Sequence, residues 1–177
     1  MKQPLDGIKI LDLSRYLPGP FATQFLADFG AEVIKIEEPG GELGRALPPF
    51  TGGMGTRFAS VNRNKKSITL DLKKDEARKI FMKLAESADV VVDQFRPGVM
   101  DKLGLGYESL KSINKGIVYC SITGYGLSGP WMKAAGHDVN YLNISGVSGL
   151  TAGREGAPVM SSVQIADVAG GSLYAVI

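Results

Sequence analysis

The sequence contains a single cysteine, a single histidine and a single tryptophan among its 177 residues. One cysteine excludes a disulfide framework within the chain and fits a reducing compartment. The scarcity of histidine and cysteine also argues against a zinc site, which needs several such side chains at defined spacing. Cys120 lies in the apolar run GIVYCSI, which favours a small buried hydrophobic residue over a reactive thiol.

Long apolar runs and a strong charge are missing as well. No stretch approaches the roughly 20 apolar residues of a transmembrane helix, and the N-terminal stretch MKQPLDGIKILDL lacks the core of a signal peptide. The formal net charge of +2 gives no general attraction to nucleic acid or to a membrane. We therefore expect a cytoplasmic globular protein with neither partner, in which local groups of Lys and Arg supply any anion binding.

Two nucleotide-binding motifs are also absent. The turn SRYLPGPF lacks the G-x-G-x-x-G spacing of a dinucleotide fold, and Pro20 removes a backbone donor there. No G-x-x-x-x-G-K-[ST] phosphate loop occurs. These absences disfavour NAD and ATP, and no Ser-His-Asp arrangement can be assembled with any specificity.

Short hydrophobic runs alternate with segments of helical pattern along the chain. The runs typical of buried strands cover residues 8–13, 31–37, 67–72, 89–95 and 116–123. Strands that alternate with helices predict an α/β fold with a largely parallel, Rossmann-like sheet flanked by helices.

Two of the intervening segments carry apolar residues at helical spacing. The first ends at Gly30, which suits the residue after a helix C-cap, and its expected inward side chains are Phe21, Phe25, Leu26 and Phe29. The second covers 75–88, with Ile80, Phe81 and Leu84 expected to face inward. Further helices are expected from about Asp138 and from Asp167 onward.

Two regions break this pattern. Residues 39–57 are rich in Gly and Pro without periodicity, which predicts a long loop that is either functional or mobile. The chain ends at Ile177 in an apolar, helix-like segment without a C-cap residue or a polar tail. We therefore expect the natural polypeptide to continue beyond this point.

The candidate chemical groups are His137 and Asp167. A lone imidazole is more often a helix cap than a catalyst, although His suits acid–base work near neutral pH. Asp167 is a plausible N-cap, but Gly170 and Gly171 follow it, at a cost of roughly 1 kcal/mol each in a helix. That cost suggests a ligand or another backbone close by, so Asp167 is a candidate anion or thioester site. The basic residues of RNKKS (63–67) are either solvated surface or part of a phosphate-binding set.

Six stretches taken together carry a resemblance to a known family. In chain order they are PLDGIKILDLSRYLPGPFATQFLADFGAEVIKIE, NRNKKSITLDLK, ADVVVDQFRPGVMDKLGLGY, IVYCSITGYGLSGP, AGHDVNYLNISGV and IADVAGGSLYAV. The chain thus resembles the N-terminal part of the family III CoA-transferases, which include formyl-CoA transferase, carnitine CoA-transferase and α-methylacyl-CoA racemase. The resemblance implies that residues 1–177 are the N-terminal CoA-binding α/β large domain. It also implies that a small domain and a returning C-terminal segment are absent, and that the intact protein is an interlocked homodimer.

The resemblance implies a CoA thioester as substrate, with no covalently bound cofactor and no metal. The matching positions that would hold CoA are Leu70, Asp71, Leu72, Lys73, Gln94, Phe95, Arg96, Lys102, Gly136, Asp138 and Asn140. The basic residues would then bind the nucleotide and pyrophosphate of CoA. Many members carry an arginine after the second strand, where this chain has Glu38, so a neighbour such as Lys66 would have to substitute.

Two catalytic roles for Asp167 follow from the resemblance. In the racemase branch it pairs with His137 to remove and return the α-proton of a 2-methylacyl-CoA through an enolate, and the stretch AGHDVNY favours this branch. In the transferase branch it attacks an acyl-CoA to give a mixed anhydride and then an aspartyl-CoA thioester. The long segment 39–61 and NRNKKS are more typical of transferases. The racemase is our first hypothesis, the transferase the second and an inactive fragment the third.

Overall fold

The computed structural model describes residues 2–151, 153 and 156–177. Its centre is a parallel sheet of five strands: β1 (Lys9–Leu13), β2 (Glu32–Glu37), β5 (Lys65–Thr69), β6 (Val90–Asp93) and β7 (Val118–Ser121). The spatial order β5-β2-β1-β6-β7 reverses direction between β1 and β6. This confirms the α/β, Rossmann-like prediction, and ligands of such sheets bind beyond the carboxyl ends of the strands at the reversal.

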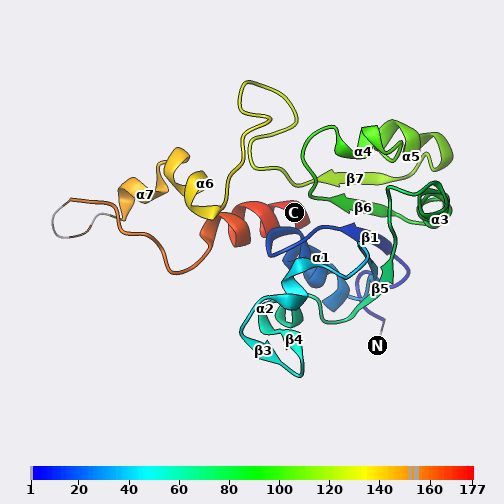
Figure 1. Ribbon diagram of the computed structural model, residues 1–177, viewed down its shortest axis with the longest axis horizontal. Helices are drawn as coiled ribbons and strands as arrows, with labels where there is room; N and C mark the ends of the chain where they lie inside the picture. Colours follow the sequence, from blue (N-terminus) through cyan, green and yellow to red (C-terminus); the bar gives the residue numbers. More distant parts are fainter. Residues whose placement is uncertain (1, 152, 154–155) are drawn as a thin grey trace.

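Helices cover both faces of the sheet (Figure 1). They are α1 (Pro18–Asp28), α2 (Thr56–Ser60), α3 (Asp75–Ala85), α4 (Val99–Lys102), α5 (Tyr107–Ile113), α6 (Asp138–Ile144), α7 (Val147–Leu150), α8 (Tyr174–Val176), the 3₁₀ helix η1 (Leu43–Ala46) and the π-helix η2 (Ala166–Leu173). Within the described part of the chain, no helix combines the length and hydropathy needed to cross a bilayer.

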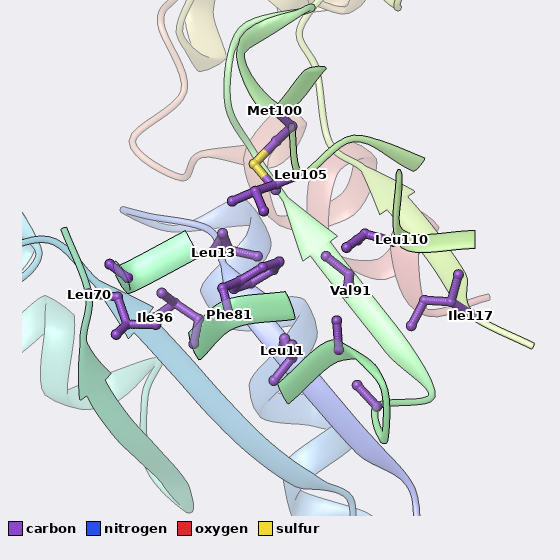
Figure 2. Close-up of a cluster of buried hydrophobic side chains, with 13 residues drawn as sticks. Leu11, Leu13, Ile36, Leu70, Phe81, Val91, Met100, Leu105, Leu110 and Ile117 are labelled. Atoms are coloured by element: carbon purple, nitrogen blue, oxygen red, sulfur yellow. The ribbon is translucent and has the colours of Figure 1, made fainter. Parts of the chain in front are cut away.

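Two hydrophobic clusters fill the space between sheet and helices. The larger packs α3, α4 and α5 against Leu11 and Val91, as Figure 2 shows, and Phe81 and Leu110 of the covering helices are fully buried there. The smaller lies on the opposite face, where Ala27 of α1 meets Ile10 and Val33. Neighbouring residues of β1 face opposite sides, as the alternation of a strand requires.

The predicted inward faces of two helices need correction. On α3, Phe81 is buried as expected, but Ile80 is 46% exposed, because Ala77 and Ala85 complete the inward face instead. On α1, Phe29 is 50% exposed and the buried side chains are small or polar, including Ala22, Thr23 and Gln24. Small residues let α1 lie close to both the sheet and η2. Gly30 adopts a φ of 104°, which confirms its place after the helix C-cap.

Residues 39–57 are not the structureless loop that their composition predicts. They contain η1 and the hairpin β3 (Phe50–Thr51) and β4 (Met54–Gly55), and they lead into α2. Arg45 holds the segment to the sheet by two 2.6 Å contacts from its guanidinium to Glu37, the last residue of β2. An ion pair leaves no periodic pattern in a Gly- and Pro-rich sequence. The ordered structure of this segment was therefore not predicted from the sequence.

Candidate functional site

Asp167 lies in the first turn of η2, and this helix packs against α1. Figure 1 shows the two side by side, although more than a hundred residues separate them in the chain. A helix was expected from Asp167 onward, but its geometry is that of a π-helix, a rare form that is frequent at functional sites. The N-terminus of α1 follows β1 at the sheet reversal, so η2 is held at the expected ligand-binding edge.

The contact between η2 and α1 explains one of the two adjacent glycines. A Cβ atom at Gly171 would lie 2.5 Å from Cβ of Pro18, whereas one at Gly170 would have no neighbour within 4 Å. The buried Ser172 hydroxyl lies 2.7 Å from the carbonyl of Pro18 and 2.9 Å from that of Asp167, and it can donate to either. Gly171 thus serves close helix packing, while the space beside Gly170 is open.

His137 and Asp138 meet Asp167 from the start of α6. The Asp138 carboxylate accepts a 3.0 Å hydrogen bond from the backbone N–H of Asp167. His137 is the N-cap residue of α6, and its own N–H donates to the Asn140 side chain at 2.9 Å. The Tyr141 hydroxyl donates to the Gly136 carbonyl at 2.8 Å, which folds the preceding turn onto the helix. The structure therefore brings together five of the predicted residues: Gly136, His137, Asp138 and Asn140 at the start of α6, and Asp167 on η2.

The Asp167 carboxyl is half-buried and carries a raised pKa. Removal from water is the main cause, and the neighbouring negative charge of Asp138 adds to it. His137 and Arg57 act in the opposite direction, because positive charge favours the ionised carboxylate. A carboxylate that is poorly hydrated is suited to attack an electrophilic carbon.

The raised pKa predicts a pH dependence that can be measured. If the ionised Asp167 is the reactive form, activity should fall as pH drops through its raised pKa, above the range of an ordinary Asp. Asp138→Asn removes the like charge but keeps an oxygen for the Asp167 N–H, so it should shift the acid limb of kcat/KM to lower pH. Glu108→Gln, on the exposed face of α5, is the control and should leave the limb in place. An unshifted limb in Asp138→Asn would contradict this assignment.

Gln94, Phe95 and Arg96 follow β6, and Phe95 and Arg96 border a cavity of about 560 Å³. The Gln94 side-chain oxygen lies 3.3 Å from the N–H of Gly19, in the first turn of α1, so it ties the two sides of the reversal together. The Phe95 ring lies under the Arg15 guanidinium, whose central carbon is 5.1 Å from the ring centroid. Arg96 is exposed. Arg15 was not among the predicted residues, yet its cation lies at this edge.

Leu70 to Lys73 follow β5, which is separated from β6 by β2 and β1. The Leu70 and Leu72 side chains pack in the larger hydrophobic cluster, so only Asp71 and Lys73 offer polar side chains to a ligand. Lys102 is exposed at the end of α4. A second cavity, of about 470 Å³, is lined by Asp75, Arg78, Lys79, Lys83 and Glu86 of the α3 region together with 103–105, and by none of the predicted CoA-binding residues. The CoA assignments stay predictions.

The basic stretch 63–67 does not form the phosphate-binding set considered from the sequence. The Lys65 ammonium is buried and donates to Asp12 at 3.0 Å and to the Pro20 carbonyl at 2.8 Å. Lys66 pairs with Glu32 and Arg63 with Asp28. Lys66 is also three residues before the end of β5, on the order of 10 Å along the strand, so it is not placed to replace an arginine beside Glu38.

Three further residues escaped the sequence pattern. Arg57 of α2 reaches the electrostatic environment of Asp167, and Tyr141 is close enough that the Asp167 charge contributes to raising its pKa, after burial and Tyr125. Ser172 bridges η2 and α1. Only Ser172 had a possible sequence signal, because it extends the small-residue run AGGS.

Cys120 packs against the smaller hydrophobic cluster, and burial together with Asp93 raises the pKa of its thiol, so it is a poor nucleophile. Among residues 2–151, 153 and 156–177, no group of three or more His, Cys, Asp or Glu side chains is placed to hold a metal ion.

The chain is similar to a group of known proteins. Residues 5–177 match the family model described as CoA-transferase family III. The chain is 49% identical over 175 residues to human succinyl-CoA:glutarate CoA-transferase, covering 98% of this chain and 40% of that protein. It is 42% identical over 179 residues to a probable fatty acyl-CoA transferase of Mycobacterium tuberculosis, covering 98% and 45%.

A solved structure of a CAIB/BAIF family protein from Brucella suis superposes with a TM-score of 0.94 at 41% identity, covering 99% of this chain and 48% of that one. The chain thus spans under half of the length of the relatives that it matches. The fold and the sequence both match these relatives over nearly all of this chain. The chain therefore belongs to CoA-transferase family III.

Proposed function

We propose that the protein containing this chain transfers CoA between a thioester and a free carboxylic acid, with Asp167 as the nucleophile. The observation that carries the proposal is the placement of the Asp167 carboxylate: half-buried, beside His137 and Asp138, on a helix packed at the sheet reversal. The family supports the reaction class, and the names of the compared relatives are those of CoA-transferases. These names favour the transferase over our first hypothesis, the racemase.

The proposed reaction proceeds through four acyl-transfer steps, in which Asp167 carries the covalent intermediates. An oxygen of the Asp167 carboxylate attacks the thioester carbonyl, and the CoA thiolate leaves, which forms a mixed anhydride. The thiolate then attacks the Asp167 carbonyl of this anhydride, releasing the first acid as carboxylate and leaving an aspartyl-CoA thioester. The acceptor acid repeats the two steps in reverse. Splitting the transfer in this way replaces one difficult displacement by easier ones.

The remaining predicted residues are proposed to hold CoA. Lys73, Arg96 and Lys102 are exposed cations at the carboxyl edge of the sheet, where they can meet phosphate oxygens. Gln94 and Phe95 stand at the reversal, between these cations and α1. An extended CoA molecule that lay along this edge would bring its thioester toward η2.

Replacing His137 distinguishes the transferase reaction from the racemase reaction. In the whole protein, His137→Ala should lower CoA transfer from succinyl-CoA to glutarate by less than about 10-fold, because His137 only adds positive charge near Asp167. Under the racemase alternative, the same variant should abolish deuterium exchange from solvent into the α-carbon of a 2-methylacyl-CoA. CoA transfer and deuterium exchange are both measured for the unmodified protein and for His137→Ala. Exchange in the unmodified protein without any transfer would overturn the transferase proposal.

Exposed apolar side chains suggest how the rest of the protein is arranged. Leu150, Met160 and Tyr174 are 86%, 76% and 82% exposed, and they lie on the C-terminal part of the described chain. Large apolar side chains that are exposed to this extent are candidates for contact with other protein. We propose that the remainder of the polypeptide and a second copy cover them in an interlocked homodimer.

A further inference from the structure

Glu42, in the Gly- and Pro-rich segment between β2 and η1, is a buried carboxylate that no step above uses. Only 7% of its surface is exposed. One of its oxygens lies 2.7 Å from the ammonium of Lys35, which is itself 1% exposed, and the other accepts a 2.8 Å hydrogen bond from the backbone N–H of Tyr16. Its own N–H donates to Glu37 at 2.9 Å. Glu42 thus joins the sheet to the loop that follows β1.

The loop that Glu42 holds is strained. Tyr16 has a φ of 65°, in the left-handed region that a non-glycine residue adopts only at a cost. The Lys35 ammonium reaches the same loop, since it donates to the Ser14 carbonyl at 2.8 Å. The Glu42–Lys35 pair therefore holds the loop at two points, the Ser14 carbonyl and the Tyr16 N–H, which lie on either side of Arg15. Strain of this kind persists only where the surroundings enforce it.

The strained loop leads directly into α1, against which η2, the helix that carries Asp167, is packed. Two residues after Tyr16, Pro18 begins α1 and supplies both the surface against Gly171 and the carbonyl that the Ser172 hydroxyl approaches. The same hydroxyl lies against the Asp167 carbonyl. A shift in the path of Tyr16 would consequently displace Pro18 and, through Ser172, the first turn of η2.

We propose that Glu42 is a positioning residue for Asp167: it fixes the left-handed turn at Tyr16, and that turn sets where Pro18 and η2 lie. This inference rests on the proposed role of Asp167 as nucleophile. It assigns a function to the segment 39–57, which its sequence leaves unexplained. A displaced nucleophile lowers turnover more than it lowers thioester binding, because the CoA-holding residues follow other strands.

The test compares Glu42→Gln with the unmodified whole protein, using succinyl-CoA and glutarate. We expect kcat to fall by about 10-fold or more while the KM for succinyl-CoA changes by less than about threefold. Glu32→Gln, on β2, removes the ion-pair partner of Lys66 on β5 without touching the loop, and it should leave both constants unchanged. An unchanged kcat in Glu42→Gln, or a loss confined to KM, would overturn the proposal.

A double-mutant cycle distinguishes positioning through Tyr16 from a general loss of folding. Tyr16→Gly takes the left-handed conformation without strain, so in this background Glu42→Gln should cost less than about threefold in kcat. An equal loss in both backgrounds would show that Glu42 acts by another route.

A readout without activity keeps the test independent of the proposed reaction. In Glu42→Gln, backbone hydrogen exchange should accelerate in both 14–18 and 166–173, with no such change in Glu32→Gln. Acceleration confined to 39–47 would contradict the link to η2. If the unmodified protein transfers no CoA, the proposed function fails, and the exchange pattern still decides whether Glu42 positions η2.

Discussion

Asp167→Asn is expected to lower CoA transfer by at least roughly 10³-fold, since an amide cannot attack a thioester as a carboxylate does. The substitution keeps the size of the side chain and does not alter the Asp167 N–H that Asp138 accepts. The packing of η2 on Pro18 should remain, so melting temperature and binding of CoA should change little. Initial rates with succinyl-CoA and glutarate measure the first effect, and calorimetry with CoA measures the second.

Trapping experiments place the covalent intermediate on one residue. With succinyl-CoA and hydroxylamine, the unmodified protein should gain a hydroxamate on the peptide that contains Asp167, detected by mass spectrometry, and Asp167→Asn should gain none. Asp71→Asn replaces another carboxylate at the carboxyl edge of the sheet and should still be labelled. Labelling at a different carboxylate, or full transfer by Asp167→Asn, would remove Asp167 from the role of nucleophile.

Gly171→Ala is the second substitution with a large expected effect. Its Cβ would lie 2.5 Å from Cβ of Pro18 and 3.6 Å from Cγ, and a proline ring at the start of a helix cannot turn away. Either η2 or α1 must shift, which should destabilise the protein by about 1–3 kcal/mol. Because the Ser172 contact with Pro18 would lengthen, we also expect kcat to fall by about 10- to 100-fold. Thermal unfolding and steady-state kinetics measure the two effects.

Gly170→Ala is the matched control for this prediction. It adds the same methyl group one residue earlier on the same helix, where a Cβ would have no neighbour within 4 Å. Replacing a helical glycine by alanine should be neutral or should stabilise by up to about 1 kcal/mol. If Gly170→Ala lost as much activity as Gly171→Ala without loss of stability, a ligand beside Gly170, rather than helix packing, would explain the pair of glycines.

Much of the fold could be predicted because burial leaves a periodic pattern. Continuous apolar runs such as VVV at 90–92 belong to strands covered on both faces, and their alternation with helices leads to a parallel sheet. The faces of α1 were harder to predict. Its large aromatic side chains suggested the inward face, but the close approach of η2 requires small residues there. Side-chain size alone cannot reveal which neighbour a helix will meet.

The sequence by itself determined the class of fold, because that depends on residue types and spacing along the chain, and its resemblance to family III CoA-transferases indicated the family and the candidate nucleophile, Asp167. Only the tertiary structure decided which partners the charged side chains contact. It placed Asp138 on the N–H of Asp167, turned Lys65 inward to Asp12, and brought Glu42 across to Tyr16. Such contacts join residues separated by dozens of positions, and their energies depend on distance and burial. The sole histidine, His137, was visible from the start, but its setting beside Asp167 came from the fold.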